Sequence, residues 1–226
     1  MTQHSVNQSL VRTLVSYLPP AVARAIHADP RQLREARAER ALAAVLLADV
    51  SGFTALTEAL GAAGADGVEE LTTLLNGYFS RMIGVLEAAG GEVVQFSGDA
   101  LVALFPADDG AALPTAVRVA HAAAGAMQAS MADFASLATS VGERELAMKI
   151  ALGAGEVLSM SIGGEKDRWQ YLIAGAPMRQ VAEGEGRAAR GEIVLSPEAA
   201  ALLARAPAAA RPRRPTPPGE LDWSHA

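Results

Sequence analysis

The sequence predicts an α+β fold with a ferredoxin-like βαββαβ core and a mostly antiparallel sheet. Three observations indicate it. An apolar run at residues 41–50 ends in an aspartate and a glycine turn, which is typical of a buried strand. Two more apolar runs, at 92–96 and 100–105, are separated by a short polar turn and therefore predict a β-hairpin. Segments with apolar residues at helical spacing come before and after this hairpin.

The composition is that of one domain of ordinary size with flanking segments. Half of the 226 residues are hydrophobic, which is enough for a substantial core, and 19% are charged. The net charge of −6 argues against nucleic acid as a partner, because non-specific binding needs a basic face. The absence of cysteine excludes disulfides, zinc thiolate sites and thiol nucleophiles. Neither a signal-peptide pattern nor a membrane-length apolar run is present, so we expect a cytoplasmic chain without a membrane partner.

The start of the chain, residues 1–40, predicts a helical N-terminal extension. Leucines at positions 10, 14 and 18 follow a helical spacing, and the mixture of Arg and Glu at 30–40 is typical of a solvated connecting helix. The central domain is expected to span residues 41–205. The chain then changes to Ala, Pro and Arg, so residues 206–226 predict a linker or a tail.

The central domain alternates strands and helices. After the first strand, a helix is expected from Thr54, followed by a longer helix at 67–89 that Gly90 and Gly91 end. The inward face of the longer helix is expected to carry Val68, Leu71, Leu75, Phe79, Met82 and Leu86. After the hairpin, the pattern predicts a helix at 115–134, strands at 146–152, 156–162 and 169–174, a helix at 177–189, a strand at 192–195 and a helix at 197–205.

Two aspartates stand at strand ends far apart in the sequence. Asp49 lies at the end of the first strand, and Asp99 lies at the tip of the hairpin. If these strands are neighbours, the carboxylates converge and can hold two magnesium ions, which prefer hard oxygen ligands and substrate phosphates. The turn at 51–54 then offers backbone N–H groups to phosphate oxygens at a helix start. Each aspartate taken alone is also typical of an ordinary turn or helix cap.

These segments resemble the catalytic domain of class III nucleotidyl cyclases. Residues 47–58 (LADVSGFTALTE) resemble the first metal-aspartate motif of that family, and residues 90–105 (GGEVVQFSGDALVALF) resemble the second. The resemblance implies domains that work as dimers with active sites at the interface, where the ribose 3′ oxygen attacks the α-phosphate and releases pyrophosphate. The likeness covers residues 41–205 and includes shorter matches at 149–155, 171–175 and 193–197.

The resemblance also implies roles for residues of the metal-binding half of the site. Asp49 and Asp99 would hold two Mg²⁺ or Mn²⁺ ions, with the Val50 carbonyl as a further ligand. Lys149 would contact the triphosphate, and a solvated strand lysine is the alternative. The phosphates would lie against the turn formed by Ser51, Gly52, Phe53 and Thr54.

The other half of the family's site does not carry over. Gln95 replaces the base-selecting residue, and Leu172 replaces a second base-reading residue. Arg179 stands where the ribose-orienting asparagine is expected, and Glu183 stands in place of an arginine, where a carboxylate would repel the charge of the transition state. This asymmetry resembles the first of two tandem domains in the soluble, bicarbonate-responsive type of adenylyl cyclase. The basic pair thought to receive bicarbonate falls at Gln95 and Ala182, so bicarbonate activation is not expected.

The sequence therefore favours the metal-binding half of an adenylate cyclase, with ATP a better candidate substrate than GTP. Such a chain needs a complementary cyclase domain, or a second copy of itself, and is expected to be weak or inactive alone. The alternative is a catalytically inactive cyclase-homology domain that binds a nucleotide or regulates a partner. A purely structural dimerisation domain would require Asp49 and Asp99 to point apart.

Overall fold

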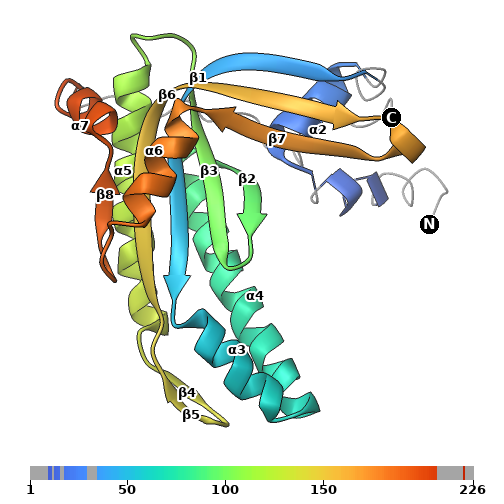
Figure 1. Cartoon of the computed structure of the whole chain (residues 1–226), viewed down its shortest axis with the longest axis vertical. Coiled ribbons are helices and arrows are strands. Elements are labelled where there is room, and N and C mark those ends of the chain that lie inside the picture. The colour runs from blue at the N-terminus through green and yellow to red at the C-terminus, as the bar shows by residue number, and fades with distance from the viewer. Residues whose placement is uncertain (1–9, 12, 16–17, 30–34, 208–220, 222–226) are drawn as a thin grey trace.

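A computed structural model describes residues 10–11, 13–15, 18–29, 35–207 and 221. Six strands form the central sheet in the order β2-β3-β1-β6-β7, with β8 paired to β6 (Figure 1). All of these pairs are antiparallel except β6–β8. With helices between β1 and β2 and between β3 and β6, this order confirms the predicted α+β fold with a ferredoxin-like core. The strands are β1 (Arg37–Ser51), β2 (Glu92–Ser97), β3 (Ala100–Ala107), β6 (Ala147–Gly163), β7 (Trp169–Gly175) and β8 (Ile193–Leu195).

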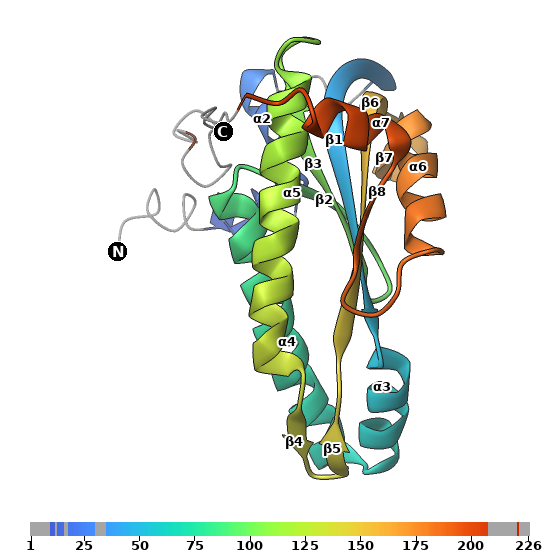
Figure 2. The same cartoon turned by 90° about the vertical axis from the view of Figure 1, so that its left-hand side faces the viewer.

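Helices cover both faces of the sheet. Figure 2 shows α4 (Ala65–Ala88) and α5 (Leu113–Ser130) on one side and α6 (Ala176–Glu185) on the other. The shorter α3 (Phe53–Ala62) packs against α4, and α7 (Pro197–Leu203) packs against α5. The chain leaves α5 through a short 3₁₀ helix, η2, and a small hairpin of β4 and β5 that the sequence did not predict. These smaller elements are η2 (Met131–Phe134), β4 (Leu137–Thr139), β5 (Gly142–Arg144) and η3 (Glu165–Asp167).

The apolar run of β1 is buried because both of its faces are covered. Leu46 and Ala48 belong to the larger core cluster, which α4 and α5 share with the sheet. Ala43 and Val45 belong to a smaller cluster that includes Val181 of α6. A strand covered on both faces is a continuous apolar run and not an alternating one. The run at 41–50 could therefore be recognised as a buried strand.

The charged stretch before this run is strand from Arg37 onward, so the connecting helix predicted at 30–40 is wrong there. Residues 30–34 lie outside the described part of the chain. β1 begins at Arg37 because its first residues pair with the far half of β6. Arg40 forms an ion pair with Glu156 across these two strands, which balances charge on an exposed part of the sheet. Pairing with β6 outweighs the helical preference of Arg and Glu.

The strands predicted at 146–152 and 156–162 form one continuous strand, β6, so the predicted break is wrong. Gly153 and Gly155 gave the appearance of a turn. In the structure these glycines allow α6 to pack closely on β6. A Cβ on Gly153 would lie 2.8 Å from the carbonyl oxygen of Pro177. Glycine inside a strand can serve close backbone approach as well as turns.

The inward face of α4 differs in part from the predicted one. Met82 and Leu86 are fully buried as expected, but Val68 is 51% exposed. Tyr78 is 3% exposed, although the prediction placed its neighbour Phe79 inward. Phe79 is partly buried against the same core. The apolar pattern of the sequence pointed to the phenylalanine and so missed the buried phenol.

The N-terminal extension is helical at residues 10–11 and 13–15 and in α2 (Pro20–Ala28). Figure 1 shows α2 beside the curved outer part of β1, β6 and β7. Arg24 fixes α2 to the sheet, because its Nη2 donates to both carboxylate oxygens of Glu92 at 2.8 Å. The tail predicted at 206–226 lies almost entirely outside the described residues. In the described part, no helix has both the length and the apolar character needed to cross a membrane.

Candidate metal and triphosphate site

The pairing of β1 with β3 brings the two predicted metal aspartates to one end of the sheet. Asp49 lies two residues before the end of β1, and Asp99 lies in the turn between β2 and β3. Its neighbour Gly98 has a φ of 65°, a left-handed conformation that glycine adopts without strain. Ala48 stands opposite Leu101 in the antiparallel register, so Asp49 and Asp99 leave adjacent strands at the same level.

Burial and the neighbouring charges act on the Asp49 carboxylate. Burial raises the pKa of Asp49, and the negative charges of Asp99 and Glu185 raise it further. The positive charge of Lys149 and a hydrogen bond from the Val50 N–H to the Asp49 carboxylate lower it. Asp99 is close enough to Asp49 for its negative charge to act on the Asp49 carboxylate. A divalent cation between them would stabilise both ionised carboxylates.

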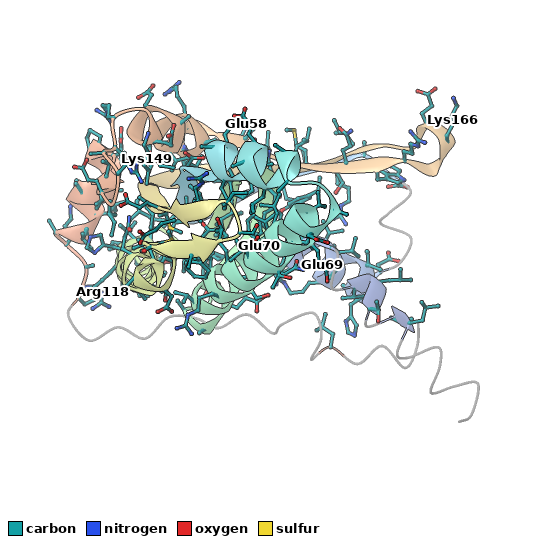
Figure 3. The ribbon with its side chains drawn as sticks, turned by 90° about the horizontal axis from the view of Figure 1, so that it is seen from below. Glu58, Glu69, Glu70, Arg118, Lys149 and Lys166 are labelled. Atoms are coloured by element: carbon teal, nitrogen blue, oxygen red, sulfur yellow. The ribbon has the colours of Figure 1, made fainter. Side chains whose placement is uncertain are left out.

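Lys149 lies beside Asp49 because the two residues face each other across β1 and β6. Its Nζ lies 3.4 Å from Oε1 of Glu185, the last residue of α6, and both side chains are about three-quarters buried, with 26% and 29% exposed. Figure 3 shows Lys149 far from Lys166, the second lysine of the chain, which lies at the tip of the β6–β7 hairpin. The sequence pattern indicated Lys149 but carried no signal for Glu185, because only the packing of α6 on β6 brings Glu185 to the site.

The predicted phosphate turn is formed as the end of β1 passes into α3. Gly52 is the N-cap of α3 with a φ of 96°, and a Cβ there would lie 2.5 Å from the carbonyl oxygen of Glu145. Glycine is therefore required at this position. No side chain caps this helix start, whose first residues are Phe53 and Thr54, and no acidic residue lies in its first turn. The first backbone N–H groups of a helix attract anions, so this turn after Ser51 is suited to phosphate oxygens.

The four positions that depart from the family pattern lie on other parts of the fold. Gln95 is exposed on β2, and Leu172 pairs with Met160 between β7 and β6. Arg179 and Glu183 are 75% and 65% exposed, and they face each other on α6 with Nε and Oε1 3.8 Å apart. Neither of these two is among the charged groups that act on Asp49 in the described part of the chain. The pair neutralises its own charges.

The residues at the end of β1 fit a divalent cation. In the described part of the chain, no three His, Cys, Asp or Glu side chains gather closely enough to enclose a metal ion unaided. Magnesium is commonly held by one or two carboxylates together with waters and substrate phosphates. Asp49 and Asp99 supply these carboxylates, the Val50 carbonyl is adjacent, and the uncapped start of α3 faces the same end of β1. The donor set therefore suits a cation that arrives with a polyphosphate.

Comparison with known proteins places this site in a family. The model of the adenylate and guanylate cyclase catalytic domain matches residues 37–216, which is more than half of the chain. The chain belongs to this family. The matched segment begins at the first residue of β1 and contains both aspartates. The family resemblance of the sequence is therefore confirmed, and domains of this family use divalent metal ions.

Individual relatives include cyclases for both purine nucleotides. Adenylate cyclase type 10 of Oryctolagus cuniculus is 29% identical over 157 residues, which are 68% of this chain but 9% of that protein. The crystal structure of the adenylyl cyclase CyaB from P. aeruginosa is 25% identical with a TM-score of 0.59, covering 75% of this chain and 83% of that chain. The guanylyl cyclase Cya2 is 27% identical with a TM-score of 0.56, covering 73% and 79%. The cyclase domain thus spans a small part of its curated relatives.

Proposed function

We propose that this cyclase domain supplies the metal- and triphosphate-binding half of an adenylate cyclase site. The observation that carries the proposal is the pair of Asp49 and Asp99 at one end of β1 and β3, where the charge of Asp99 raises the pKa of Asp49. The reaction would convert ATP into cyclic AMP and pyrophosphate at an interface with a complementary cyclase domain or a second copy. ATP is preferred over GTP in this proposal because adenylate cyclase type 10 is among the curated relatives, although Cya2 is a guanylyl cyclase.

The chain's own residues would bind and orient the triphosphate. Asp49 and Asp99, with the Val50 carbonyl, would hold two Mg²⁺ or Mn²⁺ ions, which supply positive charge to the phosphates and help to activate the attacking oxygen. The start of α3 would donate backbone N–H groups to phosphate oxygens, and Lys149 would reach a further oxygen. Each of these contacts restricts the triphosphate to one orientation relative to the sheet.

The second half of the chemistry is assigned to the partner. Base selection, ribose orientation and stabilisation of the transition state need residues that Gln95, Leu172, Arg179 and Glu183 do not provide. Arg179 could offer a positive charge, but Glu183 lies 3.8 Å from its guanidinium. A low activity of the isolated chain follows from this division.

The alternative function is a cyclase-homology module that binds a nucleotide without turning it over. The ion pair of Arg179 and Glu183 favours it, because that pair stands where the transition-state residues of the family are expected. Both functions require the same first step, which is cation-dependent binding of a nucleoside triphosphate. They differ only in what happens after a complementary domain docks.

Cyclic nucleotide production with and without a complementary domain tests the proposal. The purified chain with ATP or GTP and Mg²⁺ or Mn²⁺ should give little product. Adding a cyclase domain that carries the base-reading, asparagine and arginine residues should give cyclic AMP, and Asp49→Ala in this chain should abolish it. Robust turnover by the lone chain would refute the division of the site. Cation-dependent binding of a non-hydrolysable ATP analogue without product from any pairing would favour the module.

A further inference from the structure

Tyr78 of α4 places a polar group in the core beneath the proposed cation site. The residue is 3% exposed, its hydroxyl oxygen is fully buried, and that hydroxyl has no hydrogen-bond partner among the described residues. A buried phenol normally finds a partner, because an unpaired polar group in the core is destabilising. The unpaired hydroxyl of Tyr78 therefore calls for a functional explanation.

Aromatic neighbours hold the ring of Tyr78 close to residues of the proposed site. Edge-to-face contacts with Phe79 and Phe134, at 5.1 and 5.6 Å between ring centroids, hold the ring in place. Tyr78 also lines a small void together with Val50 and Phe53, which belong to the proposed cation and phosphate sites. Tyr78 thus borders the same void as the residue that follows Asp49 and the first residue of α3.

The charges of the site reach this hydroxyl. Burial raises the pKa of Tyr78, and the negative charges of Asp49 and Asp99 raise it further. The phenol is therefore a neutral O–H donor on which the charges of both carboxylates act. An O–H donor suits a carboxylate oxygen that a cation leaves unused, since each ionised carboxylate accepts several hydrogen bonds.

We propose that Tyr78 is a positioning residue of the cation site, whose hydroxyl donates a hydrogen bond to the Asp49–Asp99 carboxylate pair when the pair closes on a divalent cation. This inference rests on the proposed function, because it assumes that the pair holds Mg²⁺ or Mn²⁺. It adds a residue that acts through the ligands and does not touch the cation. Metal-ligating carboxylates are commonly oriented by such hydrogen bonds, whose loss lowers metal affinity about 10–100-fold.

Binding of Mn²⁺, followed by electron paramagnetic resonance in the presence of a saturating non-hydrolysable ATP analogue, tests the inference. Tyr78→Phe keeps the ring and removes the hydroxyl. We expect this variant to bind Mn²⁺ about ten-fold more weakly than the unchanged chain. Its melting temperature without cation should be equal or higher, because the hydroxyl is unpaired in that state. Tyr171→Phe is the matched control, since the Tyr171 hydroxyl is hydrogen-bonded to Ser159, and it should leave Mn²⁺ affinity unchanged.

The outcomes separate this inference from the proposed function. If Tyr78→Phe binds Mn²⁺ as tightly as the unchanged chain while Asp49→Asn loses binding, Tyr78 has no positioning role and the proposed function stands. If Tyr78→Phe lowers the melting temperature of the cation-free chain, the hydroxyl already has a partner there and the inference is wrong. If the unchanged chain binds no Mn²⁺, the inference and the proposed function are both overturned.

Discussion

Replacing Glu185 by glutamine should tighten the binding of a Mg²⁺–triphosphate complex. In the ligand-free chain the Glu185 carboxylate holds Nζ of Lys149 at 3.4 Å and adds negative charge beside Asp49. Glutamine keeps nearly the same shape and removes the charge. Lys149 is then free to turn toward a phosphate, and the incoming triphosphate meets less repulsion.

The size of this effect follows from the geometry of the ion pair. Two unit charges 3.4 Å apart attract each other by about 1 kcal/mol in bulk water and by about 5 kcal/mol at an effective dielectric constant of about 20. The side chains of Lys149 and Glu185 are 26% and 29% exposed, and the cost of desolvating the two charges offsets most of the larger attraction, so we expect a net interaction of about 1 kcal/mol. Removing about 1 kcal/mol of competition should improve the affinity about five-fold.

Calorimetry with Mg²⁺ and a non-hydrolysable ATP analogue measures this change in a double-mutant cycle. The gain from Glu185→Gln should shrink in a Lys149→Ala background, where no lysine can be released. Glu183→Gln is the matched control, because Glu183 lies on the same helix but pairs with Arg179, and it should leave the affinity unchanged. Weaker binding by Glu185→Gln would refute the reasoning, since Glu185 would then help to hold the cation itself.

Three further predictions follow from the same site. Asp49→Asn should abolish cation-dependent nucleotide binding in calorimetry, yet raise the melting temperature of the cation-free chain at neutral pH, because burial and repulsion disfavour the ionised carboxylate. The pKa of Asp49 is raised in the fold, so the stability of the cation-free chain should fall as pH rises from 3.8 through the folded pKa. Mn²⁺ affinity should rise over the same pH interval, because the cation binds the ionised carboxylate. A Mn²⁺ affinity that does not change with pH would contradict this prediction. Gly52→Ala should lower the free energy of unfolding in urea by about 1–3 kcal/mol and weaken nucleotide binding, because a Cβ at a φ of 96° would clash with Glu145. The control Gly61→Ala, in α3 with open space around it, should not destabilise the chain.

The order of elements was predictable because the decisive patterns are local. The run at 41–50 and the hairpin around Asp99 carry their own strand and turn signals, and the helix periodicity before and after them is strong. The errors at Arg37 and Gly153 have a different origin. Pairing with the long strand β6 makes β1 begin at Arg37. The glycine at 153, which resembles a turn residue in the sequence, instead allows α6 to pack closely on β6. Tertiary contacts decided both, and a single segment carries no signal of them.

The candidate site divides in the same way. Asp49, Asp99 and the glycine turn could be named from the sequence because each stands at the end of a recognisable strand or hairpin. Glu185 could not, since it reaches the site only when the end of α6 lies against β6. Tyr78 was not predicted as a core residue because the apolar pattern of α4 placed Phe79 on the inward face. A polar residue on a buried helix face is visible only after the helix is packed.

The charges that meet at the end of β1 bear on the proposed need for divalent cations and a complementary domain. Asp49, Asp99 and Glu185 bring three negative charges, and Lys149 brings one positive charge. A triphosphate would be repelled by this balance unless divalent cations arrive with it. Arg179 of α6 adds little positive charge to this balance, because its guanidinium is paired with Glu183. On the proposed function, positive charge for the transition state would come from the complementary domain, so adding that domain, and not changing the cation, should decide whether bound nucleotide is turned over.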